Sequence, residues 1–199
     1  MSESFIQLPP DSTGKKSRTL LRTINGQQVH ESVVSLDGVS VPTYSAVVAG
    51  SAVAANKHHL VIFNGSGSGK IIEILRVMIS AETTATVTGY NMGYRLIRTT
   101  SAGSGGVAVT VAKMDMQDPD LPTQITVWTN PTTAPSLGAV VAVGSVNPEE
   151  TGGTSWMPLF ECLPHMKPLT LREGEGVTVQ QYGTAGVGLF NVYVIFRVR

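Results

Sequence analysis

The sequence predicts an all-β protein, a jelly-roll-like antiparallel β-sandwich that carries an extended N-terminal arm. Short runs rich in Val, Ile and Thr recur along the chain, with turn-forming residues between them about every ten positions. The 199 residues include 21 glycines and 11 prolines, which favours strands and tight turns over helices. Residues 189–198 alternate most cleanly, with one face formed by Phe190, Val192, Val194, Phe196 and Val198.

The chain is predicted to divide into an arm, residues 1–26, and a β-sandwich domain, residues 27–199. The arm mixes prolines and polar residues with scattered apolar ones, and it cannot bury enough apolar surface to offset its ordering entropy. It therefore either lies along a neighbouring subunit or is a disordered terminus. Within the domain, residues 115–135 are predicted to form a long proline-rich loop, which contains the strand-like run TQITVWT.

The centre of the predicted core is residues 58–80. Two apolar runs flank the glycine- and serine-rich residues 64–70, a pattern that predicts a β-hairpin with a flexible tip. The second run is apolar on both faces if it alternates regularly, so we expect a strand that is covered on both sides. One face would then carry Ile71, Leu75, Val77 and Ile79, and the other Ile72, Ile74 and Met78.

Composition argues against several classes of partner. Lys plus Arg equals Asp plus Glu, 14 each, so no net charge attracts nucleic acid or an anionic membrane surface. No apolar run approaches the roughly 20 residues of a membrane span. The first residues lack the apolar core of a secretory signal, so we expect folding in the cytosol. The single Cys162 excludes an internal disulfide and a cysteine-based zinc site.

Several motifs imitate chemical sites, and none has the required pattern. Residues 64–71 resemble a phosphate-binding loop, but Asn64 replaces its first glycine and Ile71 its Ser or Thr, and a strand follows where a helix is needed. His58 and His59 are adjacent, so in a strand they point to opposite faces and cannot chelate one metal. Cys162 is expected to be a small buried residue rather than a nucleophile.

The acidic residues are also expected to be structural. Asp115, Asp118 and Asp120 lack the ligand spacing of a calcium loop, so a solvated turn is expected. Glu173 and Glu175 lie beside glycines, as turn carboxylates commonly do. We therefore predict no catalytic residue, no metal site, no cofactor and no enzymatic activity.

Residues predicted to contact a partner lie mainly on the arm. Its basic residues have no aromatic residues between them on which bases could stack, so they suit an acidic protein patch better than nucleic acid. Two tryptophans in the domain are further candidates, although both could simply fill the core. The predicted contact residues are Phe5, Ile6, Leu8, Lys15, Lys16, Arg18, Leu20, Leu21 and Arg22 on the arm, with Trp128 and Trp156 beyond it.

Three stretches resemble virion proteins of tailed bacteriophages. They are DSTGKKSRTLLRTINGQQVHESVVSL, ANKHHLVIFNGSGSGKIIEILRVMI and the closing PLTLREGEGVTVQQYGTAGVGLFNVYVIFRV. The likeness covers residues 11–113 and 156–199, and it consists of short phrases rather than a catalytic motif. It implies a jelly-roll capsid decoration (cement) protein in the virion, which binds the major capsid protein or other virion proteins as a homotrimer. It implies no cofactor and transfers no functional residue to a position of this chain.

Two other functions remain open at this point. A tail, baseplate or fibre-anchoring protein would also be rich in strands and oligomeric, and composition does not separate it from a head protein. A carbohydrate-binding β-sandwich would need exposed aromatic side chains beside polar ones, and only 6% of the residues are aromatic.

Overall fold

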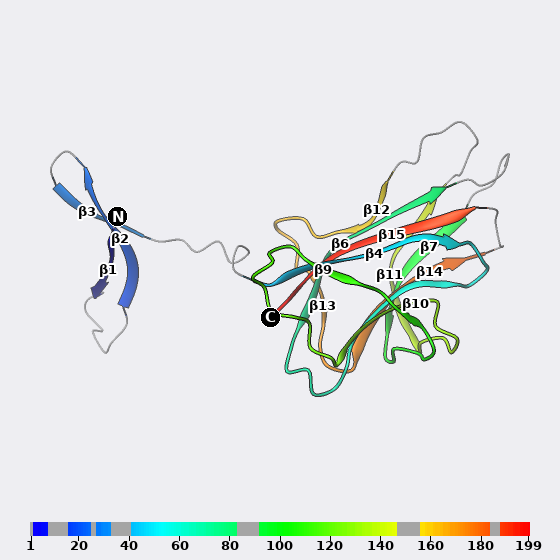
Figure 1. The fold of residues 1–199 in the computed structure, drawn as a ribbon. Coiled ribbons are helices and arrows are strands. Elements are labelled where there is room, and N and C mark those ends of the chain that lie inside the picture. The colour runs from blue at the N-terminus through cyan, green and yellow to red at the C-terminus, as the bar shows by residue number, and fades with distance from the viewer. Residues whose placement is uncertain are drawn as a thin grey trace. The chain divides into compact units, whose positions relative to one another are not determined.

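The computed structural model describes residues 2–7, 16–24, 27–32, 41–82, 92–146, 156–183 and 188–199. The chain divides into two units, Met1–Ser40 and Val41–Arg199, each described by itself below (Figure 1). Every regular element among the described residues is a β-strand, and all strand pairs are antiparallel. The predicted all-β class is therefore confirmed.

The first unit contains one small sheet. Strands β1 (Ser2–Gln7), β2 (Lys16–Ile24) and β3 (Gln27–Ser32) pair in the order β1-β2-β3. The first unit extends further along the chain than the arm predicted for residues 1–26, because β3 pairs with β2 rather than with the sandwich. The dipeptide Asn25-Gly26 between these two strands falls outside the described residues.

The second unit consists of two six-stranded sheets. The β14 sheet has the order β11-β7-β14-β5-β10-β8. The β15 sheet has the order β12-β6-β15-β4-β9, and β13 also pairs with β6. The strands are β4 (Thr43–Ala52), β5 (His58–Asn64), β6 (Ile72–Glu82), β7 (Met92–Thr99), β8 (Val107–Ala108), β9 (Val111–Lys113), β10 (Ile125–Thr129), β11 (Leu137–Val146), β12 (Met157–Glu161), β13 (Leu169–Leu171), β14 (Glu175–Tyr182) and β15 (Leu189–Val198).

The connectivity of the eight main strands is that of a jelly roll. Four of them form the row β4-β15-β6-β12, and the other four form the row β5-β14-β7-β11. The chain crosses from one row to the other at nearly every step, which produces two interlocked Greek keys. The predicted jelly-roll-like sandwich is confirmed, with β8, β9 and β10 added at its edges between β7 and β11.

The core lies between the inner faces of the two sheets. The alternation predicted for residues 189–198 is confirmed, since its five apolar residues are at most 5% exposed. Across the interior, the Tyr94 ring of β7 stacks on Phe190 of β15, with centroids 3.9 Å apart and planes 5° from parallel. Such aromatic contacts stabilise a core beyond the apolar area they bury.

The predicted hairpin over residues 58–80 is wrong. The two apolar runs are strands β5 and β6, but β5 pairs with β14 and β10, whereas β6 pairs with β15, β12 and β13. Residues 65–71 therefore cross from one sheet to the other. The predicted alternation in the second run is also interrupted, because the register between β6 and β15 shifts between Ile74 and Arg76. The buried set is Ile72 and Ile74 before the shift, and Val77 and Ile79 after it.

The proline-rich segment 115–135 is not irregular throughout. Its strand-like run forms β10, which pairs with β5 on one side and with β8 on the other. The acidic turn before it is tied to the sandwich, since Asp118 Oδ2 accepts a hydrogen bond from the Thr43 amide at 3.1 Å. Lys113 forms an ion pair with Asp120 at 2.7 Å, so these carboxylates have local protein partners.

Candidate contact surfaces

The predicted contact residues of the arm lie mainly on the β1–β3 sheet. Phe5 and Ile6 belong to β1, while five others belong to β2, namely Lys16, Arg18, Leu20, Leu21 and Arg22. Leu8 and Lys15 lie outside the described residues. Seven of the nine predicted arm residues thus belong to one three-stranded sheet.

Basic and apolar positions are interleaved in that sheet. Arg18 of β2 pairs with Phe5 of β1, and Arg22 pairs with Val29 of β3. Leu20 stands between Glu3 and Glu31 across the three strands. Cross-strand partners lie on the same face of an antiparallel sheet, so the register assigns charged and apolar positions to one face.

Trp128 lies in the second unit and is half-buried. It belongs to β10, where it pairs with Val61 of β5 and Ala108 of β8. Its Cβ lies so close to Gly106 that a Cβ on that glycine would approach it to 2.9 Å. The residue thus packs closely against its own domain and offers only part of its surface to a partner.

Trp156 contributes to a more open surface, the apolar hollow. The hollow measures about 390 Å³ and lies on the outside of the β15 sheet, lined by Val47, Met78, Trp156 and Tyr193. Val47, Tyr193 and Met78 form a row, because Tyr193 of β15 pairs with both of the others. Trp156 is 46% exposed and its ring meets Tyr193 edge-on, with centroids 6.4 Å apart.

Sequence reasoning named Trp156 but missed the other three residues of the apolar hollow. They come from β4, β6 and β15, which are far apart in sequence, and only the sheet register aligns them. One signal was present for Tyr193. It belongs to the side of β15 opposite the five core residues, where an aromatic residue has no interior to fill.

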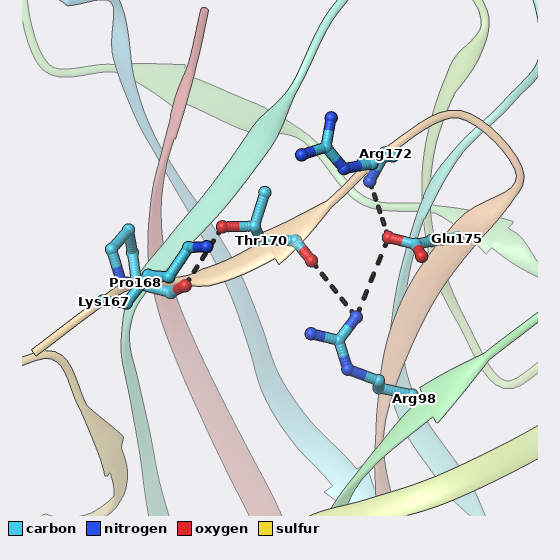
Figure 2. A pocket seen from close by; sticks show the side chains of 6 residues that line it. All are labelled: Arg98, Lys167, Pro168, Thr170, Arg172 and Glu175. Atoms are coloured by element: carbon cyan, nitrogen blue, oxygen red, sulfur yellow. Dashed lines mark hydrogen bonds and ion pairs between the residues drawn. The ribbon is translucent and has the colours of Figure 1, made fainter.

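A second depression, the basic pocket, lies where β7, β13 and β14 meet. It measures about 410 Å³ and is lined by Arg98, Lys167, Pro168, Thr170, Arg172 and Glu175. Figure 2 shows Glu175 between the Arg98 side chain and the Arg172 backbone. Arg98 Nη1 donates to the Thr170 carbonyl oxygen at 3.1 Å and lies 3.8 Å from Glu175 Oε2, which accepts from the Arg172 amide at 2.8 Å.

The charges of the basic pocket favour an anionic group. Three cationic side chains surround a single carboxylate, so the lining is positive overall. Arg98 and Glu175 are both partly exposed, and an ion pair in such a setting contributes little to stability. The guanidinium groups therefore remain suited to a carboxylate of another molecule, which they can bind through two hydrogen bonds.

The glycine-rich segment that resembles a phosphate-binding loop is bound to a carboxylate of its own chain. The amides of Gly67 and Gly69 donate to the two carboxylate oxygens of Glu173, at 3.1 Å and 2.7 Å. These two bonds lower the pKa of Glu173. Asn64 also fixes the segment, since its side-chain amide donates hydrogen bonds to the Lys70 and Leu171 carbonyl oxygens. A phosphate would have to displace Glu173 from the same amides.

The two adjacent histidines point to different surroundings, as predicted. His58 Nδ1 lies 3.0 Å from Thr178 Oγ1, while His59 Nδ1 lies 2.9 Å from Ser51 Oγ. His59 packs against Phe190, with ring centroids 4.7 Å apart. Burial lowers the pKa of His59 to about 3, and the nearby Lys57 and His58 add to this effect. The imidazole is therefore neutral and belongs to the core.

Cys162 lies near the surface of the second unit rather than in its core. It is a free cysteine and is partly exposed, and its thiol donates to the Met166 carbonyl oxygen at 3.4 Å. In the described part of the chain, no three His, Cys, Asp or Glu side chains gather where they could hold a metal ion. The same residues include no helix with the length and hydropathy to cross a membrane.

Comparison of the chain with models of protein families, with curated proteins and with solved structures found no match. The candidate surfaces therefore rest on the geometry of the chain itself.

Proposed function

We propose that this chain is a non-enzymatic structural protein of a virion and that it binds and stabilises the head shell of a tailed bacteriophage as a decoration protein. The fold supports the proposal in part, because a jelly roll exposes broad sheet faces on which neighbours can dock. The likeness of residues 11–113 and 156–199 to phage virion proteins supplies the biological setting. Its partners would be the major capsid protein or other virion proteins.

The observation that carries the proposal is the apolar hollow. Folding leaves the row of Val47, Tyr193 and Met78, with the ring of Trp156 beside it, on the outside of the β15 sheet. A contiguous apolar surface with aromatic residues is typical of a protein contact site, where such residues contribute most of the binding energy.

The first unit supports a second point of attachment. A small three-stranded sheet has little interior of its own and needs a hydrophobic face packed on another element to be stable. We place that element on a neighbouring subunit, with Phe5 and Leu20, which lie on the same face as Arg18 and Arg22, as apolar contacts and these basic residues opposite acidic groups. Two modest contacts on one chain act together, because the first raises the effective concentration for the second.

The basic pocket fits the same role. Arg98 and Arg172 could bind an Asp or Glu side chain that projects from a neighbouring subunit. This contact would fix the orientation of the domain more than it would increase affinity, because its charges stay partly exposed to solvent.

A tail, baseplate or fibre-anchoring role is the closest alternative. It would use the same surfaces, so copy number separates the two roles. Quantitative mass spectrometry of purified particles should find hundreds of copies if the protein decorates the head, and only a handful if it belongs to the tail.

A carbohydrate-binding role has one observation in its favour, the exposed pair of Trp156 and Tyr193. Sugar hydroxyls also need hydrogen-bonding groups around the ring. The other residues that line the apolar hollow, Val47 and Met78, supply none from their side chains. We therefore favour a protein partner, and consistent hits on a glycan array would reverse that choice.

Rebinding to depleted particles tests the proposal. Purified protein is added to heads and, separately, to tails from particles assembled without it, and the bound copies are counted. Trp156→Ala should reduce binding to heads by about tenfold or more, as expected for an aromatic residue at the centre of a contact. Met116→Ala is the matched control, because Met116 is 83% exposed and lies outside the apolar hollow. Equal binding of the two variants, or binding to tails alone, would contradict the proposal.

A further inference from the structure

In the described part of the chain, the two sheets of the second unit end in four edge strands. The β14 sheet ends in β11 and β8, and the β15 sheet ends in β12 and β9. An edge strand presents unpaired backbone amides and carbonyls, which can pair with a strand of another molecule. Proteins that stay monomeric usually protect these edges by keeping them short, by placing proline or charge on them, or by distorting them with bulges.

Three of the four edges are protected in this way. Strand β8 has two residues, and β9 has three and carries Lys113. Strand β12 has five residues, with Pro158 at its second position and the charged Glu161 at its end. Glu161 is also held in an ion pair with Arg76 at 2.6 Å. These strands leave little regular backbone for another chain.

The fourth edge, β11, has neither proline nor charge. It runs for ten residues, LGAVVAVGSV, and within the described part of the chain it pairs only with β7. Leu137, Val140 and Val143 are 47%, 48% and 61% exposed. Two register shifts interrupt its first half, but residues 142–146 follow β7 without a break. Val141, Ala142 and Val146 pack against the core and hold the strand in place.

The sequence of β11 favours a second copy of itself as the partner strand. Residues 138–144, GAVVAVG, consist only of Gly, Ala and Val, with Val141 at the centre and a glycine at each end. Antiparallel pairing about that residue would set Val140 against Ala142, Ala139 against Val143, and Gly138 against Gly144. Large residues would thus meet small ones, and no charge would be buried. An interface made of one patch on both partners has two-fold symmetry.

We infer that β11 is a self-association edge, through which two copies of the chain join their β14 sheets by antiparallel β11–β11 pairing. The inference does not depend on the proposed place of the protein in a virion, since it concerns the isolated chain. It also changes the expected oligomer. Two-fold pairing gives a dimer, whereas the resemblance to decoration proteins implied a trimer.

Light scattering coupled to gel filtration tests the inference on the full-length chain over a range of concentrations. The wild type should approach twice the chain mass of 21.0 kDa at high concentration. Val143→Lys places a charge on the edge and should weaken self-association by at least about tenfold. Val140→Lys should do the same. Val107→Lys is the matched control, since Val107 is 65% exposed on the two-residue edge β8 and should leave the dimer intact.

Hydrogen exchange provides a second readout that damage to the fold would not reproduce. Amides of β11 should exchange more slowly in the wild type at high concentration than after dilution, and Val143→Lys should abolish that difference while core amides of β15 stay protected. A wild type that remains at one chain mass or assembles at three would overturn the inference. So would a Val143→Lys variant that associates as strongly as Val107→Lys.

Discussion

The two faces of the β15 sheet differ in how much of their apolar surface folding buries. The inner face carries Phe190, Val192 and Val194, which are buried against the opposite sheet. The outer face of the same strands carries Tyr193, with Met78 and Val47 beside it, around an open hollow. Neighbouring residues of one strand therefore differ in burial: one lies in the core and the next lies on the open outer face. The inner ones account for the stability of the domain, whereas the outer ones gain full burial only if another molecule covers them.

The difference separates residues that fold the protein from residues that serve its contacts. Apolar side chains on the inner face cannot be shortened without leaving a cavity. Apolar side chains on the outer face can, because solvent already reaches them. Stability and binding should therefore respond to different sets of substitutions.

The largest expected effect separates the two faces directly. Phe190→Ala should lower the free energy of unfolding by about 3–5 kcal/mol, because it leaves a cavity against Tyr94 and His59. Tyr193→Ala, three positions further along the same strand, should cost about 1 kcal/mol or less. Urea unfolding of both variants measures the contrast. Comparable losses at the two positions would show that the outer face is part of the folding core.

The next largest effect is the pH dependence of the free energy of unfolding, which depends on the buried His59. His59 has a folded-state pKa of about 3 against an ordinary value of 6.5, so the unfolded chain binds a proton that the folded chain does not. The free energy of unfolding should therefore fall as the pH drops through 6.5, with a slope that approaches about 1.4 kcal/mol per pH unit near pH 5. The pKa of His58 is lowered by burial as well and adds to the slope.

Two variants identify the source of that slope. His59→Gln should flatten the dependence of unfolding free energy on pH between 6.5 and 5, measured by urea unfolding at several pH values. His165→Gln is the control for replacing a histidine, because His165 is exposed. A slope that is as steep in His59→Gln as in the wild type would place the acid sensitivity in another group.

The inner face was largely predictable from the sequence, and the path of the chain between sheets was not. The alternation in β15 identifies its buried residues because the strand is regular and has one face in the core. The segment 58–80 has the local pattern of a hairpin, which is two apolar runs joined by a glycine-rich loop. The same pattern also fits two strands in different sheets joined by a loop that crosses between the sheets. Only long-range pairing, β5 with β14 and β6 with β15, distinguishes the two.

The outer face was predictable only in part. Trp156 was named as a candidate contact residue, but Val47 and Met78 look like ordinary strand residues until register sets them beside Tyr193. The basic pocket has the same origin, since Arg98, Lys167 and Arg172 are separated by up to 74 positions and are brought together by the pairing of β7 with β14.

The smallest effect is expected at the loop that connects the two sheets. Glu173→Gln should weaken the bonds from Gly67 and Gly69, and their amides should exchange faster with solvent, with little change in global stability. The low pKa of Glu173 means that acid should loosen the loop as pH falls through that pKa, while neutral pH leaves it intact. Lys70→Ala is the control and should change neither property, since Lys70 is exposed. A large loss of function on removing Lys70 would point instead to an anion bound at the loop.

An electron-microscopy map of the native assembly tests the central claim most directly, because it shows what lies on the outer face of the β15 sheet. We predict that a neighbouring subunit covers Val47, Tyr193 and Trp156 in every copy of the chain. A map in which these residues face solvent throughout the assembly would contradict the account.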